Sequence, residues 1–238
     1  MLQVCALTDP GQVRQSNQDA FRIVSELGLY MLADGMGGAR GGEQASRMAV
    51  EAIEGSLRRS ARRDAATLLS AVEEANAVVL GAASRDPNLE GMGTTVVAVL
   101  ETRANDIAIA SVGDSRAYIL HEGELRAVTT DQTWVQEVGV GMGLDEASLR
   151  THPMRHVLTM AVGVASAVRI LYYALELDQR DILLLTTDGL HGVVPEGEIG
   201  RILRDEEATL QQRCERLMEA AHAAGSPDNV TVMLMQPE

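Results

Sequence analysis

Four aspartates lie where an apolar run begins or ends, each beside a glycine or an asparagine: Asp34, Asp114, Asp188 and Asp228. An Asp-Gly pair after a strand is common in turns, so one such pair carries little information. Strand ends can converge on one edge of a sheet, where carboxylates repel one another unless they are protonated or bound to a cation. Hard divalent cations such as Mg²⁺ and Mn²⁺ take oxygen ligands. The pattern therefore favours a divalent-metal site, with ordinary turns as the alternative.

Five glycines follow Asp34 within the stretch LYMLADGMGGARGGEQ. Glycine lets a backbone turn sharply and approach a ligand closely, at a cost in strand and helix stability. We expect the first group to turn the chain away from a metal while the carbonyl of Gly35 coordinates it. We expect Gly41 and Gly42 to release the chain into a helix that starts near Glu43.

The N-terminal stretch GQVRQSNQDAF adds a fifth carboxylate, Asp19, and a cation, Arg14. The planar guanidinium of arginine matches phosphate oxygens with two parallel hydrogen bonds. An arginine close to divalent ions therefore suits a phosphate held between them. An ordinary surface ion pair is the equal alternative for Arg14.

Short apolar runs and helical periodicity predict strands first, two helices next, and then a block of strands. The strands are expected at 4–8, 20–25, 29–33, 94–100, 107–112, 117–120, 125–129, 169–177, 181–187 and 229–235. Helices are expected from Glu43, from Ala65 and around Leu210. Strands and helices that occur in separate runs indicate an α+β fold with antiparallel sheets. We expect a single domain, 1–238, with two packed sheets and helices outside them.

The composition is apolar enough for a sizeable core, with 46% hydrophobic residues among 238, but only 3% are aromatic. A net charge of −14 argues against nucleic acid and anionic membranes as partners, since both are bound through basic patches. No apolar run approaches the roughly 20 residues that cross a bilayer. Cys5 and Cys214 are expected to be reduced core residues of a cytoplasmic protein. We expect a monomer, because no apolar stripe is left unexplained.

Six motifs occur in order over nearly the whole chain: RQSNQD (14–19), ADGMGG (33–38), GTT (93–95), VGDSRAY (112–118), TTDGL (186–190) and PDNVT (227–231). In these motifs the sequence resembles the bacterial branch of the metal-dependent protein phosphatases, the protein phosphatase 2C family. The resemblance implies a four-layer α-β-β-α sandwich with a mobile flap at about 132–165. It also implies hydrolysis of phosphoserine and phosphothreonine in proteins, with a Ser/Thr kinase and its substrates as partners.

The resemblance also assigns two Mn²⁺ or Mg²⁺ ions to the edge of the sheets. Asp34 would bridge them, and the carbonyl of Gly35 would bind one of them. Asp188 and Asp228 would bind the other ion. A hydroxide shared by the two ions would then attack phosphorus directly, because two adjacent metals lower the pKa of a bound water.

Three further assignments follow from the same motifs. Asp19 would hold metal-bound waters, and Arg14 would bind the substrate phosphate. Asp114, together with Asp188, would form a third and weaker metal site. Arg14 and the three main aspartates would thus be the catalytic residues: Asp34, Asp188 and Asp228.

The sequence departs from the family pattern in two places. Bacterial relatives usually have Asp-His-Ser or Asp-His-Thr where this chain has Asp131-Gln132-Thr133, and a histidine of eukaryotic relatives is replaced by Met36. The proton donor to the leaving group is therefore unassigned. The five histidines are expected to be structural or surface residues, with His156 in the flap the least certain. The basic run RRSARRD (58–64) is expected to be a solvated helix end.

Two other functions are compatible with these residues. The first is a catalytically silent, phosphoprotein-binding member of the same fold, against which the complete aspartate set argues. The second is a two-metal phosphoesterase that acts on nucleotides or small metabolites. The second is disfavoured because the motifs lack an aromatic platform for a base.

Overall fold

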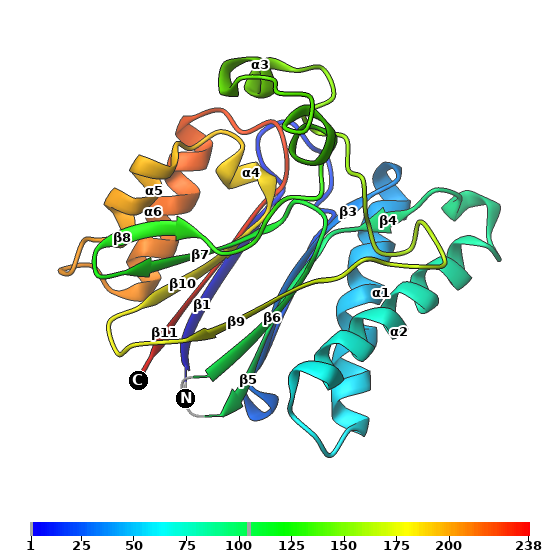
Figure 1. Ribbon diagram of the computed structural model, residues 1–238, viewed down its shortest axis with the longest axis horizontal. Coiled ribbons are helices and arrows are strands. Elements are labelled where there is room, and N and C mark those ends of the chain that lie inside the picture. Colours follow the sequence, from blue (N-terminus) through cyan, green and yellow to red (C-terminus); the bar gives the residue numbers. More distant parts are fainter. Residues whose placement is uncertain (1, 104–105) are drawn as a thin grey trace.

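Two antiparallel sheets lie face to face between two groups of helices (Figure 1). The structure is a computed structural model and describes residues 2–103 and 106–238. One sheet has the order β1 (Leu2–Asp9), β11 (Val230–Pro237), β10 (Ile182–Thr186), β7 (Arg116–His121) and β8 (Glu124–Ala127). The other has the order β2 (Asp19–Val24), β3 (Leu29–Met36), β5 (Val96–Arg103), β6 (Asp106–Val112) and β9 (Leu171–Glu176), and β4 (Gly93–Thr94) pairs with β3.

The helices form the two outer layers. Helices α1 (Gly38–Arg59) and α2 (Ala65–Ala83) cover the sheet that contains β3, at the right of Figure 1. Helices α4 (Asp188–His191), α5 (Glu196–Leu203) and α6 (Leu210–Ala223) cover the other sheet. Two short 3₁₀ turns, η1 (Ser25–Leu27) and η2 (Pro87–Leu89), complete the connections. The expected four-layer α-β-β-α sandwich is confirmed.

Alternation along the strands explains why both faces of each sheet are apolar. On β3, Tyr30 and Leu32 point to the core between the sheets, whereas Met31 and Ala33 point to the helices. On β10, Leu183 lies in the core between the sheets and its neighbours lie toward α5 and α6. Successive side chains of a strand point to opposite faces, so a strand covered on both sides must be apolar throughout. The continuous apolar runs of the sequence follow from this.

Helix α2 is, by length and composition alone, apolar enough to cross a membrane. The expectation that no apolar run approaches this length is therefore wrong for α2. In the structure the helix contributes Leu68, Val72 and Val79 to the core cluster beneath α1. The apolar character of α2 is therefore explained by its packing against α1 and the sheet.

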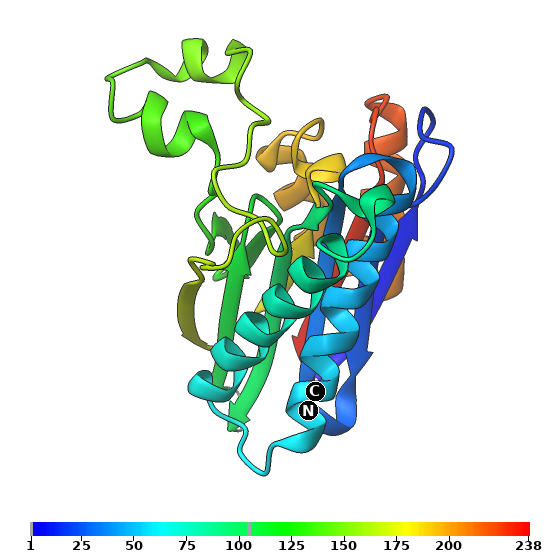
Figure 2. The same cartoon turned by 90° about the vertical axis from the view of Figure 1, so that its right-hand side faces the viewer.

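The flap rises above one end of the sandwich, at the top left of Figure 2. It contains the π-helical turn η3 (Val135–Gly139) and α3 (Glu146–Thr151). Its two arms meet in an antiparallel bridge between Thr133 and Leu158. Further along, Asn76 of α2 accepts a hydrogen bond from the backbone of Gly163 at 2.8 Å. The two arms of the flap are thus joined to each other at its base, and the second arm is held to α2.

Helix α1 begins at Gly38 and not near Glu43, so the expected start is wrong. Gly37 and Gly38 have φ angles of 115° and 79°, and they turn the chain directly out of β3. Gly41 and Gly42 lie inside α1 because the first turns of this helix touch the end of β3. A Cβ on Gly42 would lie 2.7 Å from the carbonyl oxygen of Gly35. Close backbone contact here overrides the low helix propensity of glycine.

Candidate metal centre

The predicted aspartates meet at the end of the sandwich where the flap rises. Asp34 lies near the end of β3, Asp114 lies in the turn from β6 to β7, and Asp188 begins α4, separated from β10 by one residue. Asp228 lies two residues before β11. Together with Gly35 and Arg14 they line one cavity of about 1130 Å³, called here the aspartate cavity. Strand topology therefore brings residues from five distant parts of the chain to one place.

Asp19 lies behind this cavity and directly opposite Asp34 in the register of β2 and β3. Its Oδ2 accepts hydrogen bonds from the hydroxyls of Thr187, at 3.0 Å, and Thr231, at 2.6 Å. Thr187 directly follows β10 and Thr231 lies near the start of β11, so Asp19 joins the two sheets. Its other carboxylate oxygen, Oδ1, is left over for a different partner.

Burial raises the pKa of these carboxyl groups, because the charged form is poorly solvated there. Burial is the main cause for Asp19, whose pKa is raised to about 7, for Asp188, raised to about 6, and for Asp114, raised to about 8. The pKa of Asp34 is raised well above its usual value by burial and then by the charge of Asp19 and its neighbours. The protein alone supplies too little positive charge to balance this group.

Two buried carboxylate oxygens have no hydrogen-bond partner within the described chain: Oδ1 of Asp19 and Oδ1 of Asp188. A buried polar atom without a partner is rare in folded proteins and calls for a specific explanation. The surrounding donors are all oxygens, which is the set that hard divalent cations prefer. The residues present therefore fit divalent cations between the carboxylates.

Arg14 enters the same cavity from the loop between β1 and β2. Its Nη2 donates to Oδ2 of Asp228 at 2.7 Å. The side chains are 51% and 32% exposed, so the pair lies at the mouth of the cavity and not in its floor. The surface ion pair considered from the sequence exists, and it is part of the cavity. The two interpretations of Arg14 are thus compatible.

The sequence matches the family described as "Protein phosphatase 2C" over residues 11–234. The chain belongs to this family. It is 32% identical to a serine/threonine phosphatase stp of Listeria innocua over 96% of this chain and 93% of that protein. Relatives so named are enzymes, so the family assigns an enzyme rather than a silent binding protein.

Solved structures agree with this protein phosphatase 2C assignment. The Mycobacterium tuberculosis phosphatase PstP is 33% identical, with a TM-score of 0.91 over 100% of this chain and 99% of that one. Stp1 from Staphylococcus aureus is 30% identical, with a TM-score of 0.92 over 100% and 96% of the two chains. A further structure of the PstP catalytic domain, 34% identical with a TM-score of 0.86 over 99% and 97%, contains two manganese ions.

The flap of this protein phosphatase 2C chain contributes two residues that the sequence analysis did not place in the site. Arg155 and His156 line the aspartate cavity across from the carboxylates. Partial burial, followed by the positive charge of Arg155, lowers the pKa of His156. The only signal in the sequence was an adjacent Arg-His pair inside the flap. Spacing alone could not show that the flap bends back over the aspartates.

Gln132, at the position where the family resemblance led us to expect histidine, is buried and acts as a clamp at the base of the flap. Its Oε1 accepts from the backbone N–H of Gly113 at 2.8 Å, and its own N–H donates to the Gly113 carbonyl at 2.9 Å. Its Nε2 donates to the carbonyl of Arg169 at 2.9 Å. The clamp fixes the residue before Asp114, so this departure has a structural role next to the site.

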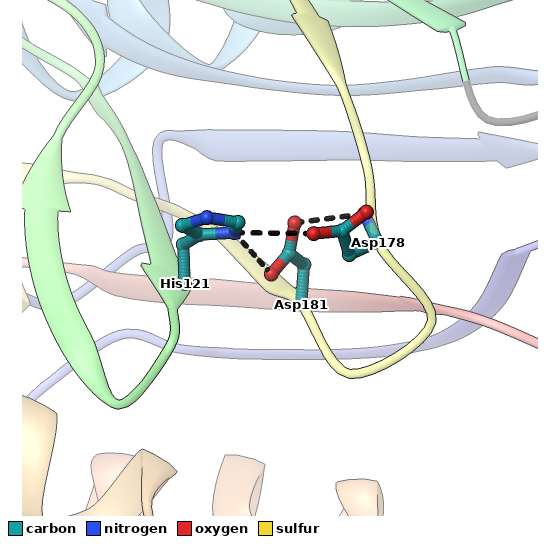
Figure 3. A group of neighbouring side chains, drawn as sticks. All are labelled: His121, Asp178 and Asp181. Carbon is teal, nitrogen blue, oxygen red and sulfur yellow. Dashed lines mark hydrogen bonds and ion pairs between the residues drawn. The ribbon is translucent and has the colours of Figure 1, made fainter.

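A second acidic group lies at the end of β10 opposite to the aspartate cavity (Figure 3). His121, Asp178 and Asp181 have ligand atoms within 4.8 Å of one another. Among the described residues, no three of the cavity carboxylates come that close. In this group the ring of His121 lies 2.8 Å from Oδ1 of Asp181. The backbone N–H of Asp178 donates to the other oxygen of Asp181, Oδ2, at 2.9 Å. These contacts tie β7 to the turn before β10.

The remaining histidines and the basic run behave largely as expected. His222 lies 3.1 Å from a carboxylate oxygen of Asp9, and His152 stacks on Trp134 with 4.5 Å between ring centres. In the basic run 58–64, the arginines make local contacts at the end of α1. The ion pairs join Arg58 to Glu54 and Glu26, Arg59 to Glu74, and Arg62 to Asp64.

Proposed function

We propose that the protein removes phosphate from phosphoserine and phosphothreonine in other proteins, with divalent cations held in the aspartate cavity. The observation that carries this proposal is the pair of buried, unpartnered carboxylate oxygens beside Asp34: Oδ1 of Asp188, which lines the same cavity as Arg14, and Oδ1 of Asp19, which lies behind that cavity. The membership in the protein phosphatase 2C family and the names of the relatives support the substrate class.

The proposed residue roles are those that the family resemblance implies, and the positions of the side chains support them. Asp34, near the end of β3, would bridge two divalent ions, and the carbonyl of Gly35 beside it would bind one of them. Asp188 and Asp228, from the opposite sheet, would hold the second ion. When bound, Mn²⁺ or Mg²⁺ ions supply a water of lowered pKa as the nucleophile and offset charge on the phosphoryl oxygens. An all-oxygen donor set accepts either metal.

Two further carboxylates extend this set. Asp114 lines the cavity with Asp188 and would form a third, weaker cation site with it. Asp19, held by two threonine hydroxyls, would orient metal-bound waters through its unpartnered Oδ1.

Arg14 would hold the substrate phosphate at the mouth of the cavity. One of its nitrogens donates to Asp228, and a guanidinium has five N–H donors in a planar fork. The remaining donors are enough for a phosphate oxygen pair without loss of the contact to Asp228. Asp228 thereby orients Arg14 toward the place where phosphate arrives.

The test is a phosphatase assay on a phosphothreonine peptide with added Mn²⁺, with Mg²⁺, and with chelator. We expect phosphate release with either metal and none with chelator. A generic aryl phosphate and a nucleotide are run beside the peptide. A preference for the nucleotide over the peptide would contradict the proposed substrate class, and no release from any substrate would contradict an enzyme.

The proposal extends to the cellular setting. We propose a monomer that acts in the cytoplasm on a Ser/Thr kinase or on that kinase's substrates, without nucleic acid or membrane. The two cysteines, Cys5 and Cys214, are buried and free, which suits a reducing compartment. The charge of −14 disfavours polyanionic partners. Light scattering of the purified protein measures the oligomeric state directly.

A further inference from the structure

The leaving group of the proposed reaction needs a proton that the residues assigned above do not supply. Phosphoserine and phosphothreonine expel an alkoxide, which is a poor leaving group unless it is protonated as it departs. The cavity aspartates bind cations only when they have lost their protons, and arginine keeps its proton in proteins. A side-chain proton donor must therefore be another group that faces the aspartate cavity.

His156 has the side chain that fits this task. Within the described chain, the residues around the aspartate cavity include no other histidine and no cysteine, lysine or tyrosine. Two hydroxyls, those of Ser16 and Thr95, also line the cavity, but alcohols are far weaker acids than an imidazolium. The hydroxyl of Thr95 is, in addition, hydrogen-bonded to that of Ser115 at 2.6 Å. Histidine is the commonest general acid because its ordinary pKa, near 6.5, lies close to the working pH.

The flap holds His156 on the side of the cavity that faces away from the sandwich. The flap rises above one end of the sandwich (Figure 2), and two residues after His156, Leu158 pairs with Thr133 at the base of the flap and also lines the cavity. In phosphoryl transfer the attacking and leaving oxygens lie roughly in line through phosphorus. A nucleophile on the side of Asp34 and Asp188 therefore drives the leaving oxygen toward the flap. His156 lies on that side.

The ring of His156 is open to a substrate. The residue is exposed, and no hydrogen bond or ion pair joins its ring to another residue in the part of the chain that the structure describes. The other four histidines are engaged or buried: His121 and His222 lie beside aspartates, His152 stacks on Trp134, and His191 has a buried ring nitrogen. One nitrogen of His156 can therefore meet the leaving oxygen while the other exchanges protons with water.

The charges around His156 favour transfer of its proton to a departing oxygen. Partial burial, and then the positive charge of Arg155, lower the pKa of His156, and the charge of Asp228 opposes them. The remaining charged groups that line the cavity come from the sandwich: Arg14, Asp34, Asp114 and Asp188. A lower pKa makes the imidazolium a stronger acid, whereas the negative charge of an arriving phosphate stabilises the protonated ring. The ring is therefore suited to hold a proton when phosphate is bound and to release it to the leaving oxygen.

We propose that His156 is the general acid of the reaction and protonates the Oγ of the departing serine or threonine. The inference rests on the proposed function, since it concerns the same reaction. The oxygen of the attacking water forms the new bond to phosphorus, and the bond from phosphorus to Oγ breaks with its electron pair left on Oγ. Oγ takes the proton of the imidazolium. The neutral ring then recovers a proton from solvent, which balances the proton that the attacking water gave up.

The experiment compares His156→Gln with the parent on substrates whose leaving groups differ in how much they need a proton. His156 is exposed, so the variant should keep the fold, and circular dichroism verifies this. His152→Gln is the matched control, because it makes the same change at the other histidine of the flap, which stacks on Trp134 and does not line the cavity. The rise in melting temperature with Mn²⁺ should be the same in all three proteins, which verifies that both variants still bind cations.

With Mn²⁺ and saturating substrate, we expect His156→Gln to lower kcat about a hundredfold on a phosphothreonine peptide and by less than about threefold on p-nitrophenyl phosphate. The nitrophenolate anion is stable without a proton, whereas the alkoxide of threonine is not. A series of substituted phenyl phosphates of similar size separates this effect from any effect on peptide binding. Across the series, the fall of log kcat with rising leaving-group pKa should be steeper for His156→Gln than for the parent or the control.

The outcomes separate the two proposals. A His156→Gln variant that loses the same factor on every phenyl phosphate, or that keeps the full rate on the peptide, would overturn the general acid. So would an equally steep dependence on leaving-group pKa in His152→Gln, or loss of the Mn²⁺ shift in His156→Gln. A parent that hydrolyses none of these substrates would instead overturn the proposed function.

Discussion

Asp181 and Asp188 lie at opposite ends of β10, and each belongs to a group of acidic residues. At the Asp181 end, both carboxylate oxygens have hydrogen-bond partners, one in the ring of His121 and one in the backbone of Asp178. At the Asp188 end, Oδ1 is buried and unpartnered, and four further aspartates share the surroundings. The tighter group is the one that needs no cation. Missing partners, rather than short distances between acids, mark the site that requires positive charge.

The largest expected effect is a difference in activity between variants at the two ends of β10. Asp34→Asn and Asp188→Asn should each lower kcat by at least about a hundredfold, because a charged group that positions the reacting centre is lost. The matched Asp181→Asn variant removes the same charge at the other end of the strand and should keep its activity. The assay is phosphate release from a phosphothreonine peptide with Mn²⁺. Activity of Asp34→Asn within tenfold of the parent would contradict the assignment.

Metal binding should distinguish the two ends without any assay of activity. A ligand that binds only the folded state stabilises it, so Mn²⁺ at saturation should raise the melting temperature of the parent by about 5 °C or more. The same rise is expected for Asp181→Asn and not for Asp34→Asn. Differential scanning fluorimetry, with and without chelator, measures it. If Asp181→Asn abolished the shift, the cation would belong to the group in Figure 3.

The pH dependence of stability should differ between metal-free and metal-loaded protein. The raised pKa values of Asp188, Asp19 and Asp114, about 6, 7 and 8, mean that ionising these groups destabilises the fold. Their contribution is fully present below the unfolded value, near 4, and is lost as pH rises through the folded values. In chelator, the melting temperature should therefore fall between about pH 4 and pH 8.

With Mn²⁺ the trend should reverse, because the metal binds the deprotonated carboxylates. The added stability should then grow with pH over the same range. Melting curves at one-unit steps of pH, with either chelator or Mn²⁺, test both trends. The Asp34→Asn variant serves as the control, since it should be less sensitive to pH in chelator. Parallel curves in the two conditions would contradict a cation at this end of β10.

Much of this arrangement could be predicted from the sequence, because strand ends and their aspartates are local features. The strand LYMLA, the Asp-Gly pair after it and the capped start of α2 at Asp64 are each set by neighbouring residues. The expected start of α1, near Glu43, was wrong because Gly42 packs against the backbone at Gly35, and a contact between two elements is not visible in the local sequence. The flap was harder still, since nothing near Arg155 shows that it bends back over the cavity.

A variant of Arg14 tests whether the aspartate end of β10 also binds the substrate phosphate. Arg14→Ala should raise KM about tenfold and change kcat less, because the phosphate loses a partner in the ground state as well as in the transition state. Arg62→Ala, which also breaks an exposed pair with an aspartate, should leave both constants unchanged. Steady-state kinetics on the phosphothreonine peptide tests this. An unchanged KM for Arg14→Ala would remove the residue from the phosphate site.

The smallest effect is expected at the compensated end of β10. The hydrogen bond to Asp181 and its charge raise the pKa of His121, so the protonated ring stabilises the fold. This contribution is fully present below the unfolded value, near 6.5, and is lost as pH rises through the raised folded value. His121→Gln should thus lower the melting temperature at pH 5.5 and change it less at pH 9, with activity and the Mn²⁺ shift intact. A loss of the Mn²⁺ shift in this variant would mean that a partnered carboxylate can still recruit a cation, and the contrast between the two ends of the strand would no longer hold.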